Sequence, residues 1–316
     1  MTRVLAIACA LALLSSHSGS AQQSELTPTF SSESELVVLH VTVKDRKGGY
    51  VGGLGQDAFL VSEDRQRQDI RFFNSQDAPV TLGLLVDSSG SMQPNRDLVI
   101  AASMAFSRAM NPQDEIFVIG FNEQIHATLP ADKPFTHHEP TLRVALVQAI
   151  KARGQTALYS AVDAGLDYVQ RGGHERQVLV IVSDGGDNAS HTTRARVLAN
   201  AQASNAVIYT IALVDPMDSD ADPGFLRQLS ESTGGLAFRP KNAGEIEEML
   251  QRVARDIRNM YTIGYVPSKA ASDSGDRRES LRRVAVDVRL PDGRKLSVRT
   301  RRAYLAGTQE ARSDAP

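Results

Sequence analysis

The chain has 316 residues, a length that predicts roughly two domains, each large enough to bury a core. Hydrophobic residues make up 41% and charged residues 23% of the chain, so we expect globular folding rather than extended disorder. The formal net charge is −2, from 35 basic and 37 acidic side chains, and this balance gives no reason to expect nucleic acid as a partner.

The N-terminus has the layout of a secretory signal peptide. Arg3 precedes an apolar run at 4–14, and small and polar residues lead up to Ala21. We expect cleavage after Ala21, so that residues 1–21 are removed during export to the periplasm or the extracellular space. No later stretch approaches the length of about 18 apolar residues that a spanning helix needs, so no membrane span is expected in the mature chain. The leader also contains the chain's single cysteine, Cys9, and disulfides are therefore not expected.

Residues 34–78 follow a flexible lead-in at 22–33 that is rich in Ser, Thr and Gln, and they predict β structure. Residues 37–43 alternate between two faces, which is the period of a strand. Short strands are expected around 59–61 and 70–73.

The middle of the chain alternates between two kinds of pattern. Nearly continuous apolar runs, typical of buried parallel strands, lie at 80–86, 116–121, 178–182 and 207–214. Apolar stripes with helical spacing lie at 95–110, 142–150, 158–169, 192–204, from 225 onward, and at 246–257. This alternation predicts an α/β domain over 79–258: a doubly wound, mostly parallel, Rossmann-like sheet with helices on both faces.

The pattern returns to β after the last helix. A strand is expected at 261–266, and alternating residues at 284–290 and 296–300 flank a Pro-Asp-Gly turn, which predicts a hairpin. Neither terminal segment is large enough to fold alone. We therefore expect 34–78 and 259–305 to pair into one small all-β, sandwich-like domain in which the α/β domain is inserted, with a polar tail at 306–316.

Polar motifs stand where three of the predicted elements meet one edge of the sheet. Asp87, Ser89 and Ser91 follow the first buried strand, Thr156 precedes a helix, and Asp184 follows the third strand. Ligands of doubly wound sheets bind at the carboxyl ends of the strands. Carboxylate and hydroxyl oxygens suit hard cations such as Mg²⁺, Mn²⁺ or Ca²⁺.

These motifs resemble the metal-ion-dependent adhesion site of the von Willebrand factor type A domain, over residues 79–258. The resemblance implies a metal site formed by Asp87, Ser89, Ser91, Thr156 and Asp184, with Mg²⁺ as the cofactor and Mn²⁺ or Ca²⁺ as alternatives. It also implies hydroxyl ligands that leave the cation under-neutralised, so that a carboxylate of a partner protein completes its coordination. In related adhesion domains the filled site is coupled to displacement of the last helix.

The outer segments carry a second resemblance, to an exported bacterial group best known from Acidobacteria that pairs a von Willebrand A domain with flanking β segments. The stretches that carry it are 41–45, 48–54, 59–64, 261–265 and 301–304. This likeness implies the same arrangement of the two kinds of segment, and it does not name a partner.

The function expected from these features is that of an exported, metal-dependent binding or adhesion protein, and not of an enzyme. One alternative is a metal-assisted hydrolase, which would need a general base near the cation, and Asp187 is the carboxylate closest in sequence. Another is an envelope scaffold with no metal-dependent ligand. The chain has no phosphate-binding P-loop, nucleophile elbow or zinc-protease motif. Ten basic against five acidic residues at 273–302 favour charged outer faces that protect the β strands from edge pairing.

Overall fold

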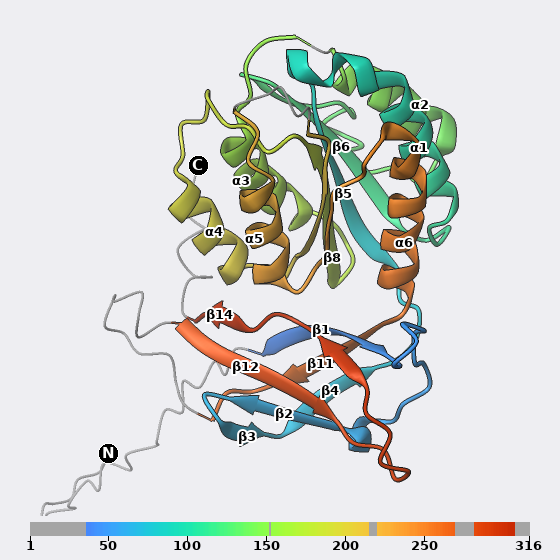
Figure 1. Ribbon diagram of the computed structural model, residues 1–316, viewed down its shortest axis with the longest axis vertical. Helices are drawn as coiled ribbons and strands as arrows, with labels where there is room; N and C mark the ends of the chain where they lie inside the picture. The colour runs from blue at the N-terminus through green and yellow to red at the C-terminus, as the bar shows by residue number, and fades with distance from the viewer. Residues whose placement is uncertain (1–35, 152, 215–219, 269–280, 307–316) are drawn as a thin grey trace, which may run out of the picture. The chain divides into compact units, whose positions relative to one another are not determined.

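The computed structural model of the protein describes residues 36–151, 153–214, 220–268 and 281–306 (Figure 1). The predicted signal peptide at 1–21 and the lead-in at 22–33 lie outside the described residues, as does most of the predicted polar tail. Within the described ranges, no helix combines the length and the apolar composition needed to cross a membrane.

A six-stranded sheet forms the centre of the α/β part, in the order β10-β9-β8-β5-β6-β7. All neighbours pair in parallel except β7, which runs antiparallel at one edge. The strands are β5 (Val80–Asp87), β6 (Glu115–Phe121), β7 (Ile125–Ala127), β8 (Arg176–Ser183), β9 (Val207–Ala212) and β10 (Ala237–Phe238). Every residue of β5 is buried, as its apolar sequence predicts.

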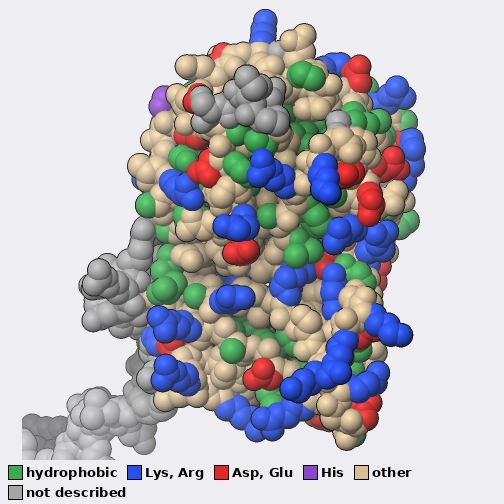
Figure 2. Space-filling view, in the orientation of Figure 1, with side chains coloured by type: hydrophobic (Ala, Val, Ile, Leu, Met, Phe, Trp, Pro, Cys, Tyr) green, Lys and Arg blue, Asp and Glu red, His purple; other side chains and the backbone are tan. Residues whose placement is uncertain are grey.

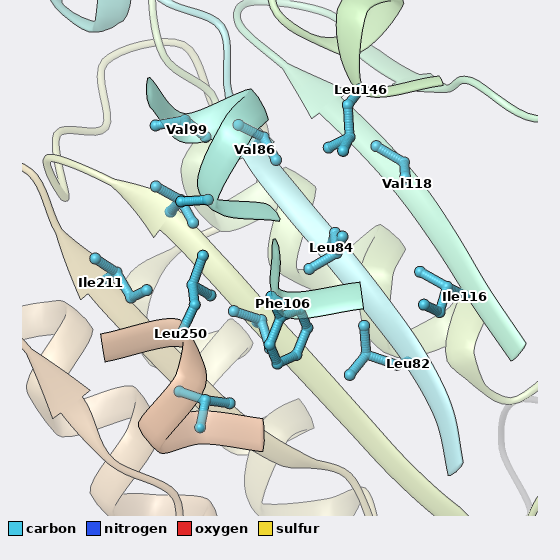
Figure 3. Packing of buried hydrophobic residues seen from close by; sticks show 14 of the residues in the cluster. Leu82, Leu84, Val86, Val99, Phe106, Ile116, Val118, Leu146, Ile211 and Leu250 are labelled. Atoms are coloured by element: carbon cyan, nitrogen blue, oxygen red, sulfur yellow. The ribbon is translucent and has the colours of Figure 1, made fainter. Parts of the chain in front are cut away.

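Helices cover both faces of this sheet (Figure 1). One face carries α1 (Arg96–Arg108), α2 (Glu139–Ala149) and α6 (Ile246–Arg258), and the other carries α3 (Leu158–Val169), α4 (Arg194–Ala203) and α5 (Pro223–Thr233). Side chains of β5 alternate between the two cores: Leu84 packs near Phe106 and Leu250 in one (Figure 3), and Leu85 packs in the other. The predicted doubly wound α/β fold is confirmed.

The terminal segments form two four-stranded sheets, β13-β1-β11-β4 and β14-β12-β2-β3. Their strands are β1 (Val37–Lys44), β2 (Phe59–Glu63), β3 (Gln66–Gln68), β4 (Ile70–Asn74), β11 (Met260–Tyr265), β12 (Leu281–Val288), β13 (Ser297–Arg299) and β14 (Ala303–Leu305). Strand β1 pairs with β11, and β2 pairs with β12, so the two ends of the chain share both sheets as predicted. Leu39, Val61 and Ile263 belong to their common core.

The predicted hairpin at 284–300 is wrong. The turn itself forms, with the Gly293 N–H donating to Leu290 O (3.0 Å) and a positive φ of 71° at Gly293. The strands on either side of it belong to different sheets, because β12 pairs with β2 and β13 pairs with β1. The alternation in the sequence identified which side chains face the core, but it carries no information about the pairing partner.

The outer face of β12 is polar, as the composition of this stretch indicated. Val284 and Val286 are buried, whereas Arg283, Ala285 and Asp287 are exposed. Figure 2 shows Lys and Arg side chains spread over this part of the molecule, with a few Asp and Glu side chains among them.

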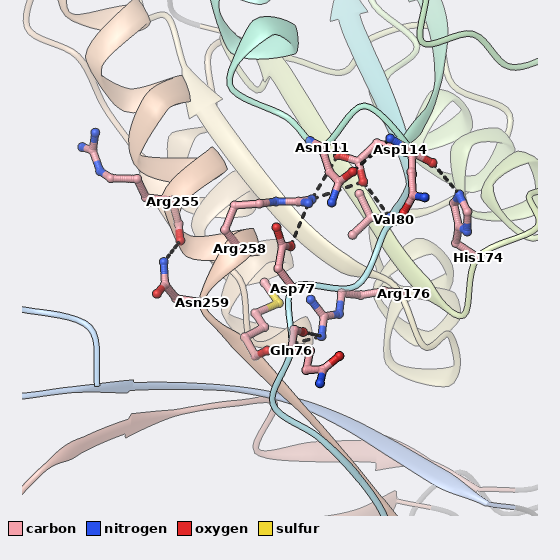
Figure 4. A network of polar contacts seen from close by, with 12 residues as sticks. Gln76, Asp77, Val80, Asn111, Asp114, His174, Arg176, Arg255, Arg258 and Asn259 are labelled. Carbon is pink, nitrogen blue, oxygen red and sulfur yellow. Dashed lines mark hydrogen bonds and ion pairs between the residues drawn. The ribbon is translucent and has the colours of Figure 1, made fainter. Parts of the chain in front are cut away.

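Buried polar contacts join the last helix to the β strands. Asp256 of α6 is fully buried and accepts hydrogen bonds from the Tyr209 hydroxyl (2.6 Å), the Tyr50 hydroxyl (3.1 Å) and the Arg299 guanidinium. Two helical residues later, Arg258 pairs with Asp77 (2.8 Å) ahead of β5 (Figure 4). One turn of α6 therefore contacts its own sheet, the N-terminal segment and the C-terminal segment.

Candidate metal centre

Asp87, the last residue of β5, lies at the bottom of the candidate site. Its side chain is fully buried, and its carboxylate accepts hydrogen bonds from the Ser89 N–H (2.8 Å) and the Ser183 hydroxyl (2.7 Å). Burial raises the pKa of Asp87 to about 6, against the lowering effect of these two bonds, and the charge of Asp184 adds to the rise. A cation beside this carboxylate would favour its ionised form.

The two serines of the same loop form a line of oxygens toward the neighbouring strand. After Asp87 the chain turns into a 3-10 helix at Gly90–Asn95. The hydroxyls of Ser89 and Ser91 lie 3.0 Å apart, and Ser91 Oγ donates to Asp184 Oδ2 (2.6 Å). The structure thus brings together two hydroxyls and one carboxylate oxygen from loops more than 90 positions apart in the sequence.

Asp184 follows β8, which is the strand next to β5 in the sheet. Its other oxygen, Oδ1, accepts from the Gly186 N–H (2.9 Å), which fixes the carboxylate in place. Gly185 between them has a φ of 92°, and a Cβ there would lie 2.4 Å from the backbone oxygen of Asp222. Only glycine fits at this position, so the tight turn after Asp184 depends on Gly185.

Thr156 is held against the same loop through its backbone. The Thr156 N–H donates to the Asn188 side chain (2.9 Å), and Thr156 O accepts from the N–H groups of Asn188 and Ala189 (2.9 and 3.0 Å). Its side chain is largely buried, with 6% exposed. The sequence therefore predicted correctly that the loops of the proposed ligands lie together at one edge of the sheet; the assignment of their residues as metal ligands stays a prediction.

Sequence reasoning missed two residues that support the site. Ser183 fixes Asp87 from the neighbouring strand, and Asn188 positions Thr156. Asp187, considered above as a general base, has an oxygen that accepts from the Tyr159 N–H (3.0 Å) and the Ser190 hydroxyl (2.5 Å). Asp187 thereby satisfies a backbone donor in the first turn of α3, which is a structural role.

The donors gathered here are oxygens, and hydroxyls outnumber carboxylates. No cluster of three or more His, Cys, Asp or Glu side chains suited to a metal ion occurs in the described part of the chain. A cation at this edge would therefore depend on the serine and threonine hydroxyls. Such a set suits a hard cation and leaves it short of negative charge.

Comparison with known proteins agrees with this architecture. The model of the von Willebrand factor type A domain family matches residues 82–252, more than half of the chain. The protein belongs to this family. A comparison with curated proteins gave no match.

Among solved structures, the chain is similar to a von Willebrand factor type A protein from Catenulispora acidiphila. The TM-score is 0.50 at 12% identity, over 87% of this chain and 75% of the other, and this likeness shows a shared fold. It is also similar to the conserved hypothetical protein BatB from Bacteroides thetaiotaomicron (TM-score 0.44, 13% identity, 56% of this chain and 98% of the other). A third structure is proximal thread matrix protein 1 from the mussel byssus with a zinc-occupied MIDAS motif (TM-score 0.46, 14% identity, 57% of this chain and 48% of the other).

Proposed function

We propose that this von Willebrand A protein binds a partner protein through a divalent cation at the carboxyl edge of its sheet. The observation that carries the proposal is the line of oxygens from Ser89 through Ser91 to Asp184, with distances of 3.0 and 2.6 Å. Asp87 stands behind this line, buried and fixed by its two hydrogen bonds.

The donor set fits a hard cation. Ser89, Ser91, Thr156, Asp87 and Asp184 would hold it, and Mg²⁺ is the first candidate, with Mn²⁺ and Ca²⁺ as alternatives. Zinc, present in the mussel protein, is a further metal to test. When bound, the cation would supply an electrophilic position for an anionic oxygen from outside, and a carboxylate of a partner protein has that chemistry.

The same residues argue against the hydrolase alternative. A metal-assisted hydrolase needs a base that can take a proton from water beside the cation. The loops at 88–95 and 153–157 contain no histidine. In the loop at 184–193, His191 is exposed and its N–H donates to Ser160 Oγ of α3 (3.1 Å), and Asp187 is also engaged with α3. We therefore propose a binding protein rather than an enzyme.

The test is capture from an extract of the source cells on immobilised protein, with Mg²⁺ or with a chelator. We expect one or more proteins to be retained with Mg²⁺ and released by the chelator. Asp184→Asn should lose this retention, and Asp187→Asn, a change of the same size in the same loop, should keep it. Amidation of carboxylates in the extract should also abolish it. If retention is unchanged by the chelator and by amidation, the result would contradict the proposal and favour the scaffold alternative.

Export is part of the same proposal. It rests on the predicted leader at 1–21, whose apolar run and small residues before Gln22 have the form of a signal peptide. N-terminal sequencing of the protein purified from its native cells should begin at Gln22. A chain that begins at Met1 would contradict export by this route.

A further inference from the structure

A buried arginine at the other end of the sheet lacks acceptors for part of its guanidinium. Arg176 begins β8, at the amino edge of the parallel strands, and only 2% of it is exposed. Its Nη2 reaches Thr262 Oγ1 (3.1 Å) and Met260 O (3.3 Å). Nη2 also reaches Gln76 O (3.4 Å), as Figure 4 shows. Its Nε and Nη1 have no hydrogen-bond partner among the described residues. Buried donors without acceptors destabilise a folded protein, so this arrangement needs an explanation.

Nearby nitrogens of His40 and Arg258 also lack hydrogen-bond partners among the described residues. Thr262 Oγ1, which accepts from Arg176, lies 3.5 Å from Nδ1 of the buried His40. If the hydroxyl proton points to Nδ1, the ring hydrogen is on Nε2, and Nε2 also lacks a partner. Nε of Arg258 is also buried without a hydrogen-bond partner. Four of the seven such side-chain atoms found in the described ranges are thus nitrogens of these three cationic or basic residues.

The carboxylates near Arg176 are already paired with another arginine. Asp77 and Asp114 both pair with Arg258, at 2.8 and 3.1 Å, and no described carboxylate accepts a hydrogen bond from Arg176. Burial, followed by the charge of Arg258, lowers the pKa of Arg176, and the charges of Asp77 and Asp114 oppose this shift. The Arg176 guanidinium is therefore a buried cation that no described carboxylate contacts directly.

A cavity of about 230 Å³ adjoins this arginine. Its wall includes Arg176, Thr262, the amide of Asn74, His174 and the ring of Phe72, which is 37% exposed. Since water occupies about 30 Å³ per molecule in the liquid, the cavity has room for an anion the size of acetate or phosphate. The acidic side chain in the wall is Glu175, which is exposed.

We propose that this cavity is a binding site for a small oxyanion, a carboxylate or a phosphate group, and that the Arg176 guanidinium, whose unpartnered nitrogens are buried beside the cavity, turns toward the anion on binding. An oxyanion presents several acceptors in a small volume, and guanidinium donors match that geometry better than water does. The site lies at the edge of the sheet opposite the candidate metal centre and does not depend on it. Its wall combines β4 and β11 with the start of β8, so an occupant would contact both the β strands and the α/β part.

The chain offers a direct reporter for this site. It contains no tryptophan, so Phe72→Trp introduces a single fluorophore at the cavity wall. We would titrate sodium acetate and sodium phosphate into this variant at constant ionic strength, balanced with sodium chloride. The expected result is a saturable fluorescence change with at least one of the two anions. Saturation by acetate alone assigns a carboxylate, and saturation by phosphate alone assigns a phosphate.

Three further variants in the Phe72→Trp background separate binding from folding. Asn74→Asp preserves the acceptor for the Gln76 N–H (2.8 Å) while placing a negative charge in the wall, and it should weaken binding at least tenfold. Arg176→Gln should abolish saturation, whereas Arg227→Gln, at an exposed position on α5, should not change it. Because Asn74→Asp leaves Arg176 in place, it keeps the test decisive if Arg176→Gln does not fold. Lack of saturation with both anions, or unchanged saturation in Asn74→Asp, would overturn the proposal.

Discussion

Two aspartates three positions apart, Asp184 and Asp187, have different roles in one loop. Asp184 accepts from Ser91 and the Gly186 N–H at the candidate metal centre, whereas Asp187 accepts from Tyr159 and Ser190 at the start of α3. The sequence alone presents both as carboxylates after a strand. Their hydrogen-bond partners separate a candidate ligand from a residue that stabilises a helix.

This difference gives a prediction about metal-dependent stability. Mg²⁺ bound only to the folded state adds about 2.7 kcal/mol to the free energy of unfolding at a hundredfold excess over Kd. Asp184→Ala should remove this increment. Asp187→Ala should lower the stability without Mg²⁺ but keep the increment. Thermal unfolding with Mg²⁺ and with chelator measures both, and equal stability of the folded wild type in the two conditions would count against the site.

His40 predicts an acid-sensitive contribution to stability. Burial, followed by the charges of Arg176 and Arg301, lowers its pKa from 6.5 to about 3. Below pH 6.5 His40 therefore binds a proton in the unfolded state but not in the folded state. The free energy of unfolding falls as the pH falls. The loss from this residue should reach about 2 kcal/mol between pH 8 and pH 5.

Urea unfolding of wild type and His40→Gln at both pH values isolates this contribution, because the other titrating groups are common to the two proteins. The difference in stability between the proteins should shrink or reverse at pH 5. A difference that stays constant with pH would show that His40 does not titrate as expected.

At the candidate metal centre, the sequence predicted that the proposed ligands lie at one edge of the sheet. This prediction works because β5 and β8 are parallel neighbours, so their carboxyl ends meet at that edge. It could not find Ser183, since the apolar run of β8 predicts a buried strand but not a hydrogen bond from its last residue to Asp87 on the next strand. Asn188 was missed for a similar reason, because its contact with Thr156 depends on how two loops approach each other.

At the scale of elements, α6 shows how a polar residue can be hidden in an amphipathic pattern. The apolar residues of this helix predict a face against the sheet, and Leu250, Val253 and Ile257 are fully buried there. Asp256 interrupts that pattern and would be expected in solvent, yet it is fully buried because Tyr209 and Arg299 reach it from two other elements. Burial and the charge of Asp256 raise the pKa of Tyr209 well above its usual value, so the hydroxyl stays a donor.

Asp256→Asn should therefore destabilise the protein strongly. The amide can still accept from Tyr209, but Arg299 loses its counter-ion, and removing one partner of a buried pair costs about 3–5 kcal/mol. The control is Glu248→Gln on the exposed side of α6, which should change stability by less than about 0.5 kcal/mol. Denaturant unfolding measures both, and a loss similar to that of the control would contradict the assigned role.

The elements themselves were predictable to different degrees. The helices and parallel strands of the α/β part follow from long periodic segments, which tertiary contacts reinforce. The pairing of β12 and β13 was not predictable, because both strands have alternating residues and a good turn between them, and only the available edges of β1 and β2 decide the partner. The short edge strands β7, β10 and β14 leave almost no periodic signal.

At the scale of the whole molecule, α6 leads directly into β11 with Asn259 as the one residue between them. If the last helix moves when the metal site is filled, as the family resemblance implies, β11 must move with it or resist. A flexible Gly-Ser insertion between Asn259 and Met260 should therefore change the affinity for the protein captured with Mg²⁺. Coupling is reciprocal, so a change in what constrains the helix appears at the metal site.

Surface plasmon resonance with the captured protein measures this effect. The same insertion in the exposed Pro291-Asp292-Gly293 turn serves as the control, because that turn connects β12 to β13 and not α6 to β11. Equal affinity of both insertion variants and the wild type would remove the β strands from the binding mechanism.

The pairing of the chain's two ends also has a consequence for the order in which the protein acquires structure. His40 and Thr262 are opposite each other in the β1–β11 pair, although they are 222 positions apart. Once the α/β part has folded, the Arg258–Asp77 pair holds its two ends together and leaves only about 40 residues in the effective loop. This shortening lowers the entropic cost of closing the pair by about 1.5 kcal/mol. The strands made first should therefore be among the last to pair, and pulse-labelled hydrogen exchange during refolding should protect the amides of β5 and β8 before those of β1.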